Sequence, residues 1–211
     1  IPGAAHSGGD LYMVKPDLVG ALEKGQDKFK VIKLEAVIVP VKKVTGDIGL
    51  LQISDTATDY AGVCLSKDGE LIAKEEDTNQ KNHASFLQTA IQSVFQKSNH
   101  TLASIDAVAV TGGPGSYTGI RVGLSSAKGI CYALNKPLII LNTLQVMAAS
   151  ALETIKEKNL VADDHFIIYP MIDARRMEVF GGMYNQNLLS IGQTNSLIID
   201  DSFFNGLNKT E

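Results

Sequence analysis

The sequence predicts an α/β fold: a mixed β-sheet flanked by helices, followed by a second, smaller subdomain. Three observations lead to this prediction. Asp68-Gly69 separates two apolar runs, a pattern typical of a β-hairpin. Strand-like and helix-like segments then alternate between residues 82 and 158, as they do in strand–helix–strand units. Three further strand-like runs follow a polar stretch at residues 156–164, which is a candidate domain boundary.

Each element has its own pattern. Residues 48–54 are a near-continuous apolar run, as expected for a strand that is buried on both faces. Residues 82–98 carry apolar side chains at helical spacing. The remaining predicted strands are residues 60–66, 70–76, 105–111, 137–142, 166–173, 178–184 and 188–194, and the remaining predicted helices are residues 118–134 and 143–158.

The domain organisation follows from these elements. Residues 1–47 form an N-terminal segment of unknown role, a tag remnant or an extension. Within it, residues 18–24 predict a short helix that stops at Gly25, and residues 31–41 alternate like a strand. Residues 48–160 are expected to form the first subdomain. Residues 161–211 form a second subdomain that is expected to be incomplete, because it contains no long helix of its own to cover its sheet.

Composition narrows the function classes. With 45% hydrophobic and 20% charged residues, the chain is typical of a globular protein. A net charge of −4 argues against strong direct binding of nucleic acid, which needs a clustered basic face. No apolar run is long enough to span a membrane and no secretory signal is visible, so a cytoplasmic location is expected. The two cysteines, Cys64 and Cys131, lie in apolar contexts and are predicted to be buried, reduced thiols.

The most informative motif is GGPGSYTGIRVG at residues 112–123. It follows an apolar strand and opens a helix, where backbone N–H groups can bind an anion. Ser116 or Thr118 can cap that helix, and Arg121 can add a charged contact to a phosphate. The glycines can instead serve only close packing between strand and helix. The motif is neither a P-loop nor a dinucleotide-binding fingerprint.

Small residues recur every four positions along the same helix, at Gly119, Gly123 and Ala127. Such a stripe lets another element approach closely. The sequence leaves two alternatives open: packing against the chain's own sheet, or a helix–helix dimer seam.

Two other motifs contain aspartates at strand ends. Asp55 begins the DTAT motif and can hold a metal-bound water near phosphates, or simply form a turn. Asp173 precedes Arg175 and Arg176, which can bind an anion or an acidic partner, or remain solvated. The four histidines are isolated, and the sequence has no His-x-x-x-His pair and no Gly-x-Ser-x-Gly nucleophile elbow.

These motifs carry a family resemblance. They lie at residues 53–69, 105–130, 137–148 and 171–180, with His83 opening the first long helix. Through them the chain resembles the TsaB (YeaZ) family of tRNA threonylcarbamoyladenosine biosynthesis proteins, which are glycoprotease-like paralogues of TsaD. The resemblance spans residues 48–203. It implies an actin-like ATPase fold built from two ribonuclease-H-like subdomains.

The resemblance also implies a function. The chain would be a non-catalytic scaffold or activator subunit of the tRNA-modifying complex, a homodimer when alone, with tRNA contacted only indirectly. Its partners would be a TsaD-like catalytic subunit and a TsaE-like ATPase. No catalytic residue, metal or cofactor is expected on this chain alone, whereas ATP and Mg²⁺ are expected in the complex. The partner interface would involve the helices at 82–98 and 118–134, through His83, Leu87, Ile91, Gly119, Gly123 and Ala127.

Two alternatives remain. The chain could be an ATP-binding or ATP-hydrolysing enzyme of the same fold, or, less in keeping with its sequence, a metallopeptidase. The candidate phosphate- or nucleotide-proximal residues are Asp55, Thr56, Gly113, Gly115, Ser116, Arg121 and Asp173.

Overall fold

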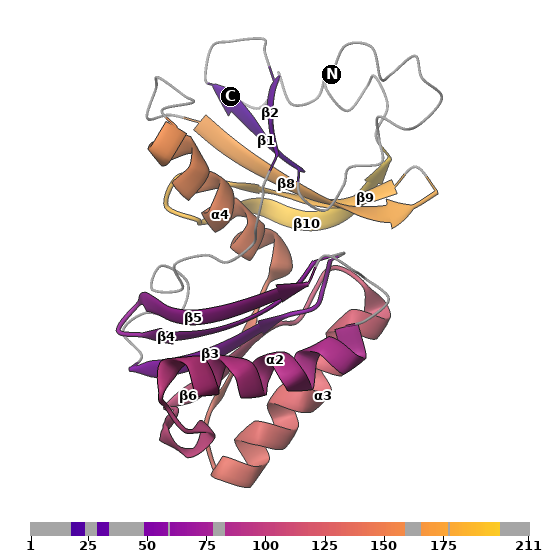
Figure 1. The fold of residues 1–211 in the computed structure, drawn as a ribbon. Coiled ribbons are helices and arrows are strands. Elements are labelled where there is room, and N and C mark those ends of the chain that lie inside the picture. The colour runs from indigo at the N-terminus through magenta and orange to yellow at the C-terminus, as the bar shows by residue number, and fades with distance from the viewer. Residues whose placement is uncertain are drawn as a thin grey trace. The chain divides into compact units, whose positions relative to one another are not determined.

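The computed structural model describes residues 18–23, 29–33, 49–58, 60–77, 83–158, 166–176 and 178–198. Backbone contacts divide the chain into two compact units, one of Ala36–Val146 and one of Ile1–Glu35 with Met147–Glu211. Each unit contains one five-stranded sheet (Figure 1).

The sheet of the first unit has the strand order β5-β4-β3-β6-β7. Its strands are β3 (Leu50–Asp55), β4 (Ala61–Lys67), β5 (Glu70–Asp77), β6 (Ala107–Thr111) and β7 (Leu138–Leu141). β3, β4 and β5 pair antiparallel, whereas β6 pairs parallel with both β3 and β7. The sheet is therefore mixed, as predicted.

The predicted hairpin is confirmed, because Lys67 pairs with Glu70 across the turn between β4 and β5. Both turn residues have positive φ, 54° at Asp68 and 85° at Gly69. Such a turn matches the right-handed twist of the flanking strands.

Two long helices, α2 (His83–Ser98) and α3 (Tyr117–Leu134), cover one face of this sheet (Figure 1). The short 3₁₀ helix η2 (Leu102–Ser104) follows α2. The Ser116 side chain accepts a hydrogen bond from the Gly119 N–H and so caps α3, while Asn135 ends the helix in the left-handed conformation. The core between sheet and helices is a single cluster: Val63, Leu65, Leu87, Ala90, Ile91, Val94, Phe95, Ile105, Val108, Val110, Ala127 and Cys131.

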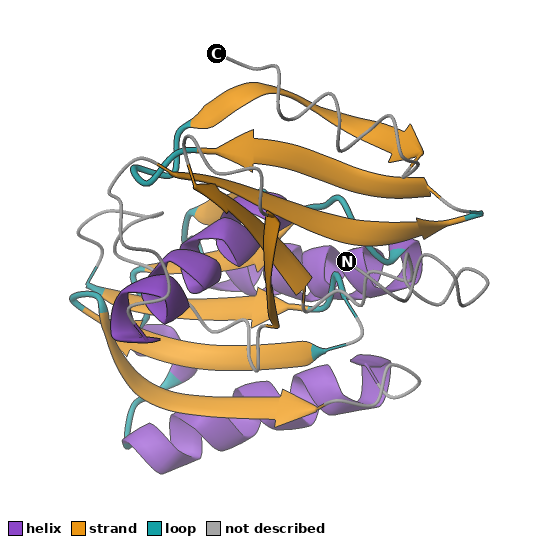
Figure 2. Ribbon diagram, turned by 90° about the horizontal axis from the view of Figure 1, so that it is seen from above, coloured by secondary structure: helices purple, strands orange, loops and turns teal. Residues whose placement is uncertain are grey.

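The sheet of the second unit has the order β10-β9-β8-β1-β2, and all of its strand pairs are antiparallel (Figure 2). Its strands are β1 (Leu18–Glu23), β2 (Phe29–Lys33), β8 (Phe166–Arg175), β9 (Glu178–Tyr184) and β10 (Ser190–Ile198). The helix α4 (Thr143–Lys158) belongs to this unit from Met147 onward.

One sequence expectation needs correction here. The predicted helix at residues 18–24 is the strand β1, because Leu18–Glu23 pairs with β2 on one side and with β8 on the other. Pairing along both edges outweighs a weak local helix preference. Most of α4 is grouped with the second sheet, and the expectation that the second subdomain is incomplete stays a prediction.

The division by contacts does not follow the expected boundaries. It falls inside α4, before Met147, and it groups residues 1–35 with the second sheet. The assignment of residues 48–160 and 161–211 to separate subdomains stays a prediction. The predicted strand at residues 31–41 extends beyond the described residues. The tag-like segment at the start of the chain lies outside them.

Both cysteines are free and buried, as predicted. Burial is the main cause that raises the pKa of the Cys64 thiol from 9.0 to about 12. Burial likewise raises the pKa of Tyr169, in the second unit, from 10.0 to about 12.

These two groups predict a loss of stability at alkaline pH. Folding favours their neutral forms, so their contribution is complete below the unfolded-state pKa values and is lost as the pH rises toward 12. Urea unfolding should therefore give a lower free energy of unfolding at about pH 11 than at about pH 8. The Cys64→Ala variant should lose less stability over this interval. An equal decrease in the free energy of unfolding for the two proteins would contradict the assignment to Cys64.

Candidate functional site

The candidate site is formed where β3 and β6 end side by side. Because these strands are parallel, their carboxyl ends lie at the same edge of the sheet. Asp55 ends β3 and Thr111 ends β6. One carboxylate oxygen of Asp55, Oδ1, accepts hydrogen bonds from the Ala57 N–H at 2.9 Å and from the Thr111 hydroxyl at 2.8 Å. Asp55 thus ties its own turn to the neighbouring strand.

The glycine-rich turn packs directly on the segment that follows Asp55. The Ser116 N–H donates to the Ala57 carbonyl at 2.6 Å, and the Thr56 hydroxyl donates to the Gly119 carbonyl at 2.7 Å. A Cβ atom on Gly115 would lie 2.2 Å from the Ala57 carbonyl oxygen, and one on Gly119 would lie 1.9 Å from that of Thr56. No other residue fits at these positions without moving backbone.

The other end of the turn is held in the same way. The Gly112 N–H donates to the Leu141 carbonyl at 2.8 Å, and the Thr143 N–H donates to the Gly113 carbonyl at 2.9 Å. Gly113 has a φ of 115° and Gly115 a φ of 152°. The glycines therefore have a packing role within the chain, which is one of the two alternatives that the sequence left open.

The small-residue stripe on α3 also faces its own subunit. Gly119, Gly123 and Ala127 are buried. A Cβ on Gly123 would lie 2.6 Å from the Thr56 hydroxyl oxygen and 3.2 Å from a Val110 methyl group. This corrects the expectation that these residues meet a partner, because their surface is already covered.

Leu87 and Ile91 lie in the same hydrophobic core, so the correction extends to them. His83 begins α2, and its side chain lies outside the described part of the structure.

The opposite face of α3 is open to solvent. Tyr117 is 73% exposed and Tyr132 is 92% exposed. The Arg121 guanidinium donates to the Tyr117 hydroxyl at 3.0 Å and lies 5.2 Å from the centre of its ring. A Cβ on Gly129 would meet no atom of the described residues within 4 Å. The Gln88 side chain donates to the Ser126 hydroxyl at 2.9 Å and links α2 to this helix.

Sequence reasoning missed Tyr117 and Tyr132, and it placed Gly129 near the small-residue stripe. The helical period could have found them, because these positions lie opposite the small-residue stripe.

The predicted phosphate-proximal residues separate into three places. Asp55, Thr56, Gly113, Gly115 and Ser116 come together at the end of the first sheet, as described above. Arg121 lies on the exposed face of α3 and bonds to Tyr117. Asp173 belongs to the second unit, where its Oδ1 atom accepts the Arg175 N–H at 2.7 Å.

No group of three or more histidine, cysteine, aspartate or glutamate side chains is placed to hold a metal ion in the described ranges. Within the same ranges, none of the helices is long and apolar enough to cross a membrane.

The first sheet and its helices define an actin-like, ribonuclease-H-like α/β protein. A solved structure titled YeaZ from Pseudomonas aeruginosa has the same fold, with a TM-score of 0.62 and 24% identity over 73% of this chain and 70% of that one. The family described as "TsaD: tRNA N6-adenosine threonylcarbamoyltransferase" matches residues 71–206. The chain belongs to this family, in its TsaB (YeaZ) branch.

Two curated relatives support this assignment, and both are named tRNA threonylcarbamoyladenosine biosynthesis protein TsaB. The Bacillus subtilis protein is 30% identical over 132 residues, which are 62% of this chain and 52% of the relative. The Haemophilus influenzae protein is 34% identical over 126 residues, which are 60% of this chain and 50% of the relative. The chain thus spans about half the length of the relatives that it matches.

The two faces of α3 predict opposite effects of the same substitution. Gly119→Ala should destabilise the fold by about 1–3 kcal/mol, because its methyl group would overlap the Thr56 carbonyl. Gly129→Ala should stabilise it by about 0.5–1 kcal/mol, because alanine favours the helix and meets nothing. Urea unfolding of both variants provides the measurement. A similar change in both would contradict the described packing of α3.

Proposed function

We propose that this chain is a non-catalytic scaffold or activator subunit of the tRNA threonylcarbamoyladenosine modification complex, and that it dimerises with a TsaD-like catalytic partner. Its family membership supports a role in this pathway. The observation that carries the proposal is the division of α3 into two faces. One face packs within the chain's own fold, and the other is exposed and carries Tyr117, Gly129 and Tyr132.

Gly129 is the strongest support for a helix–helix contact. Glycine in the middle of a helix costs about 0.5–1 kcal/mol relative to alanine, and no described residue lies within 4 Å of the Cβ position of Gly129. A glycine on an exposed helix face allows the backbone of a neighbouring helix to approach closely. A partner that packs across α3 at this position would account for a residue that the fold itself does not need.

The aromatic residues of the same face fit the chemistry of an interface. Tyrosine and arginine are enriched among residues that dominate binding energy, since they combine a large apolar surface with a polar end. Tyr117 and Arg121 already hold each other through a hydrogen bond and a cation–π contact. Because Gln88 and Ser126 join α2 to α3, the two helices can act as one rigid surface.

The glycine-rich turn supports the non-catalytic part of the proposal. Asp55 Oδ1 has two donors from its own subunit, and the turn bonds to residues 56, 57, 141 and 143 of the same chain. These groups stabilise the junction of β3, β6 and α3. In the proposed complex, a TsaE-like ATPase joins the pair, ATP and Mg²⁺ belong to the assembly, and the location is the cytoplasm.

Co-purification with a TsaD-like protein tests the interface. Gly129→Trp should abolish the complex, because the indole would hold the partner helix away, and Tyr132→Ala should weaken it at least about tenfold. Ala103→Leu, an exposed change in η2, is the matched control and should leave binding unchanged. Circular dichroism should report folded protein for every variant. Wild-type affinity in the Gly129→Trp variant would refute this interface.

Calorimetry separates the proposal from the ATP-binding alternative. Mg-ATP should give no saturable heat with the isolated chain. Saturable binding that disappears in Asp55→Asn, with unfolding unchanged, would favour the nucleotide-binding enzyme.

A further inference from the structure

The hairpin between β8 and β9 carries two adjacent arginines in an unusual backbone conformation. Arg175 has a φ of 68° and Arg176 a φ of 55°. Arg175 pairs with Glu178 across the turn, and the register of the two strands shifts between Asp173 and Arg175. The Asp173 carboxylate holds this irregularity in place by accepting the Arg175 N–H at 2.7 Å.

Arginine is a poor residue for this conformation. A positive φ brings the Cβ atom too close to the backbone, so tight hairpins favour Asn, Asp or Gly at such positions. Asparagine followed by glycine would make the same turn with less strain. The stability of the hairpin therefore does not explain two consecutive arginines.

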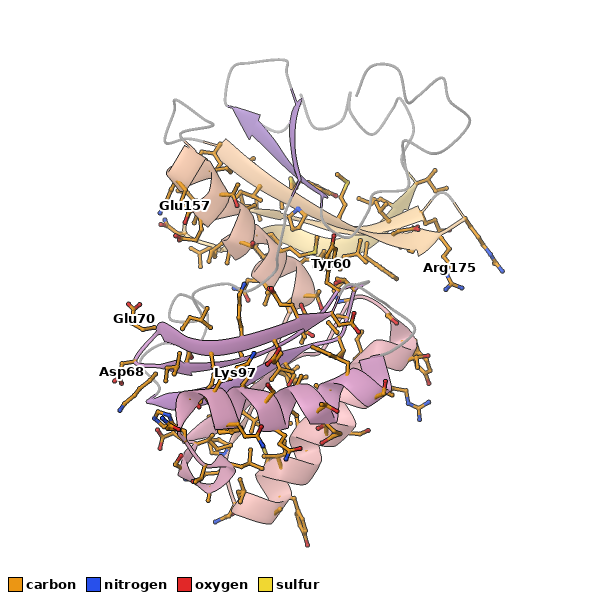
Figure 3. The ribbon with its side chains drawn as sticks, viewed as in Figure 1. Tyr60, Asp68, Glu70, Lys97, Glu157 and Arg175 are labelled. Carbon is orange, nitrogen blue, oxygen red and sulfur yellow. The ribbon has the colours of Figure 1, made fainter. Side chains whose placement is uncertain are left out.

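Their charges are not neutralised within the described part of the chain. The ion pairs recorded there join Lys74 to Glu76 and Lys97 to Glu75, and neither involves Arg175 or Arg176. The nearby Glu178 accepts a hydrogen bond from the Ser196 hydroxyl at 2.8 Å. Both arginines are exposed, and Figure 3 shows the Arg175 side chain projecting from the end of the hairpin.

We propose that Arg175 and Arg176 form a contact for backbone phosphates of RNA. This inference rests on the proposed function, in which the substrate of the complex is a tRNA. A guanidinium group donates two parallel hydrogen bonds to a phosphate, and it keeps its charge at every physiological pH. The net charge of −4 excludes a broad basic surface, and it is compatible with one narrow contact at the tip of a hairpin. Contact with tRNA would then be direct at this one place.

The decisive variant replaces the strained pair by the residues that the turn prefers, Arg175→Asn with Arg176→Gly. Its thermal midpoint should rise by about 2–4 °C, because the left-handed conformation is then unstrained. Its affinity for RNA should fall at least about tenfold, because two charge-assisted contacts are lost. A variant that is more stable and yet binds less cannot owe the loss to unfolding.

The measurement is a two-dimensional NMR titration of the isolated full chain with an unmodified tRNA transcript at low salt. Shifts should cluster at residues 173–178 and shrink as salt is added. They should vanish in the double variant and persist in Lys156→Gln, which removes an exposed charge from α4 instead. Because no partner protein is present, the outcome is independent of the α3 interface.

Three results would overturn the proposal. The transcript could shift no resonance at residues 173–178, or shift them equally in the double variant. Poly-glutamate could shift these resonances while the tRNA transcript does not, which would assign the tip to an acidic protein partner.

Discussion

The contact between the segment after Asp55 and the first turn of α3 holds the first unit together. Thr56 donates to the Gly119 carbonyl, and Ser116 donates to the Ala57 carbonyl. Neither Gly115 nor Gly119 has room for a Cβ atom. This contact fixes the position of α3 against β3 and β6 and decides which side of the helix faces inward. Because the inward side is fixed, Tyr117, Gly129 and Tyr132 lie on the side of α3 that faces outward.

The same constraint supports the proposed difference between this protein's use of the fold and nucleotide binding. A glycine-rich turn before a helix can present N–H groups to a phosphate, and here several groups of the turn already have partners in the chain. One carboxylate oxygen of Asp55, Oδ1, accepts hydrogen bonds from Ala57 and Thr111 and so ties the end of β3 to β6. In the proposed function, a fold that elsewhere serves catalysis is retained as a surface for assembly.

Sequence patterns predicted the elements of the first unit well, because their signals are local. The Asp68-Gly69 turn, the apolar strand β6 and the spacing of Leu87, Ile91 and Val94 each depend on a few neighbouring residues. The role of the glycines on α3 was not predictable in this way, because it depends on Thr56, which is 63 residues away from Gly119. The strand β1 was missed for the same reason, since its conformation is set by pairing with β8.

The pairing of β1 with β8 has a consequence for the order of folding. In the first sheet, the neighbour of β3 is β6, which follows within the same unit, so Ala36–Val146 contains every strand that its sheet needs. In the second sheet, the neighbour of β8 is a strand near the start of the chain. During synthesis, residues 18–33 leave the ribosome before the first unit does, yet they acquire this partner only after residue 170 has emerged. The first unit can therefore fold while the ribosome is still translating the second. The second sheet forms only when β8 becomes available to pair with β1.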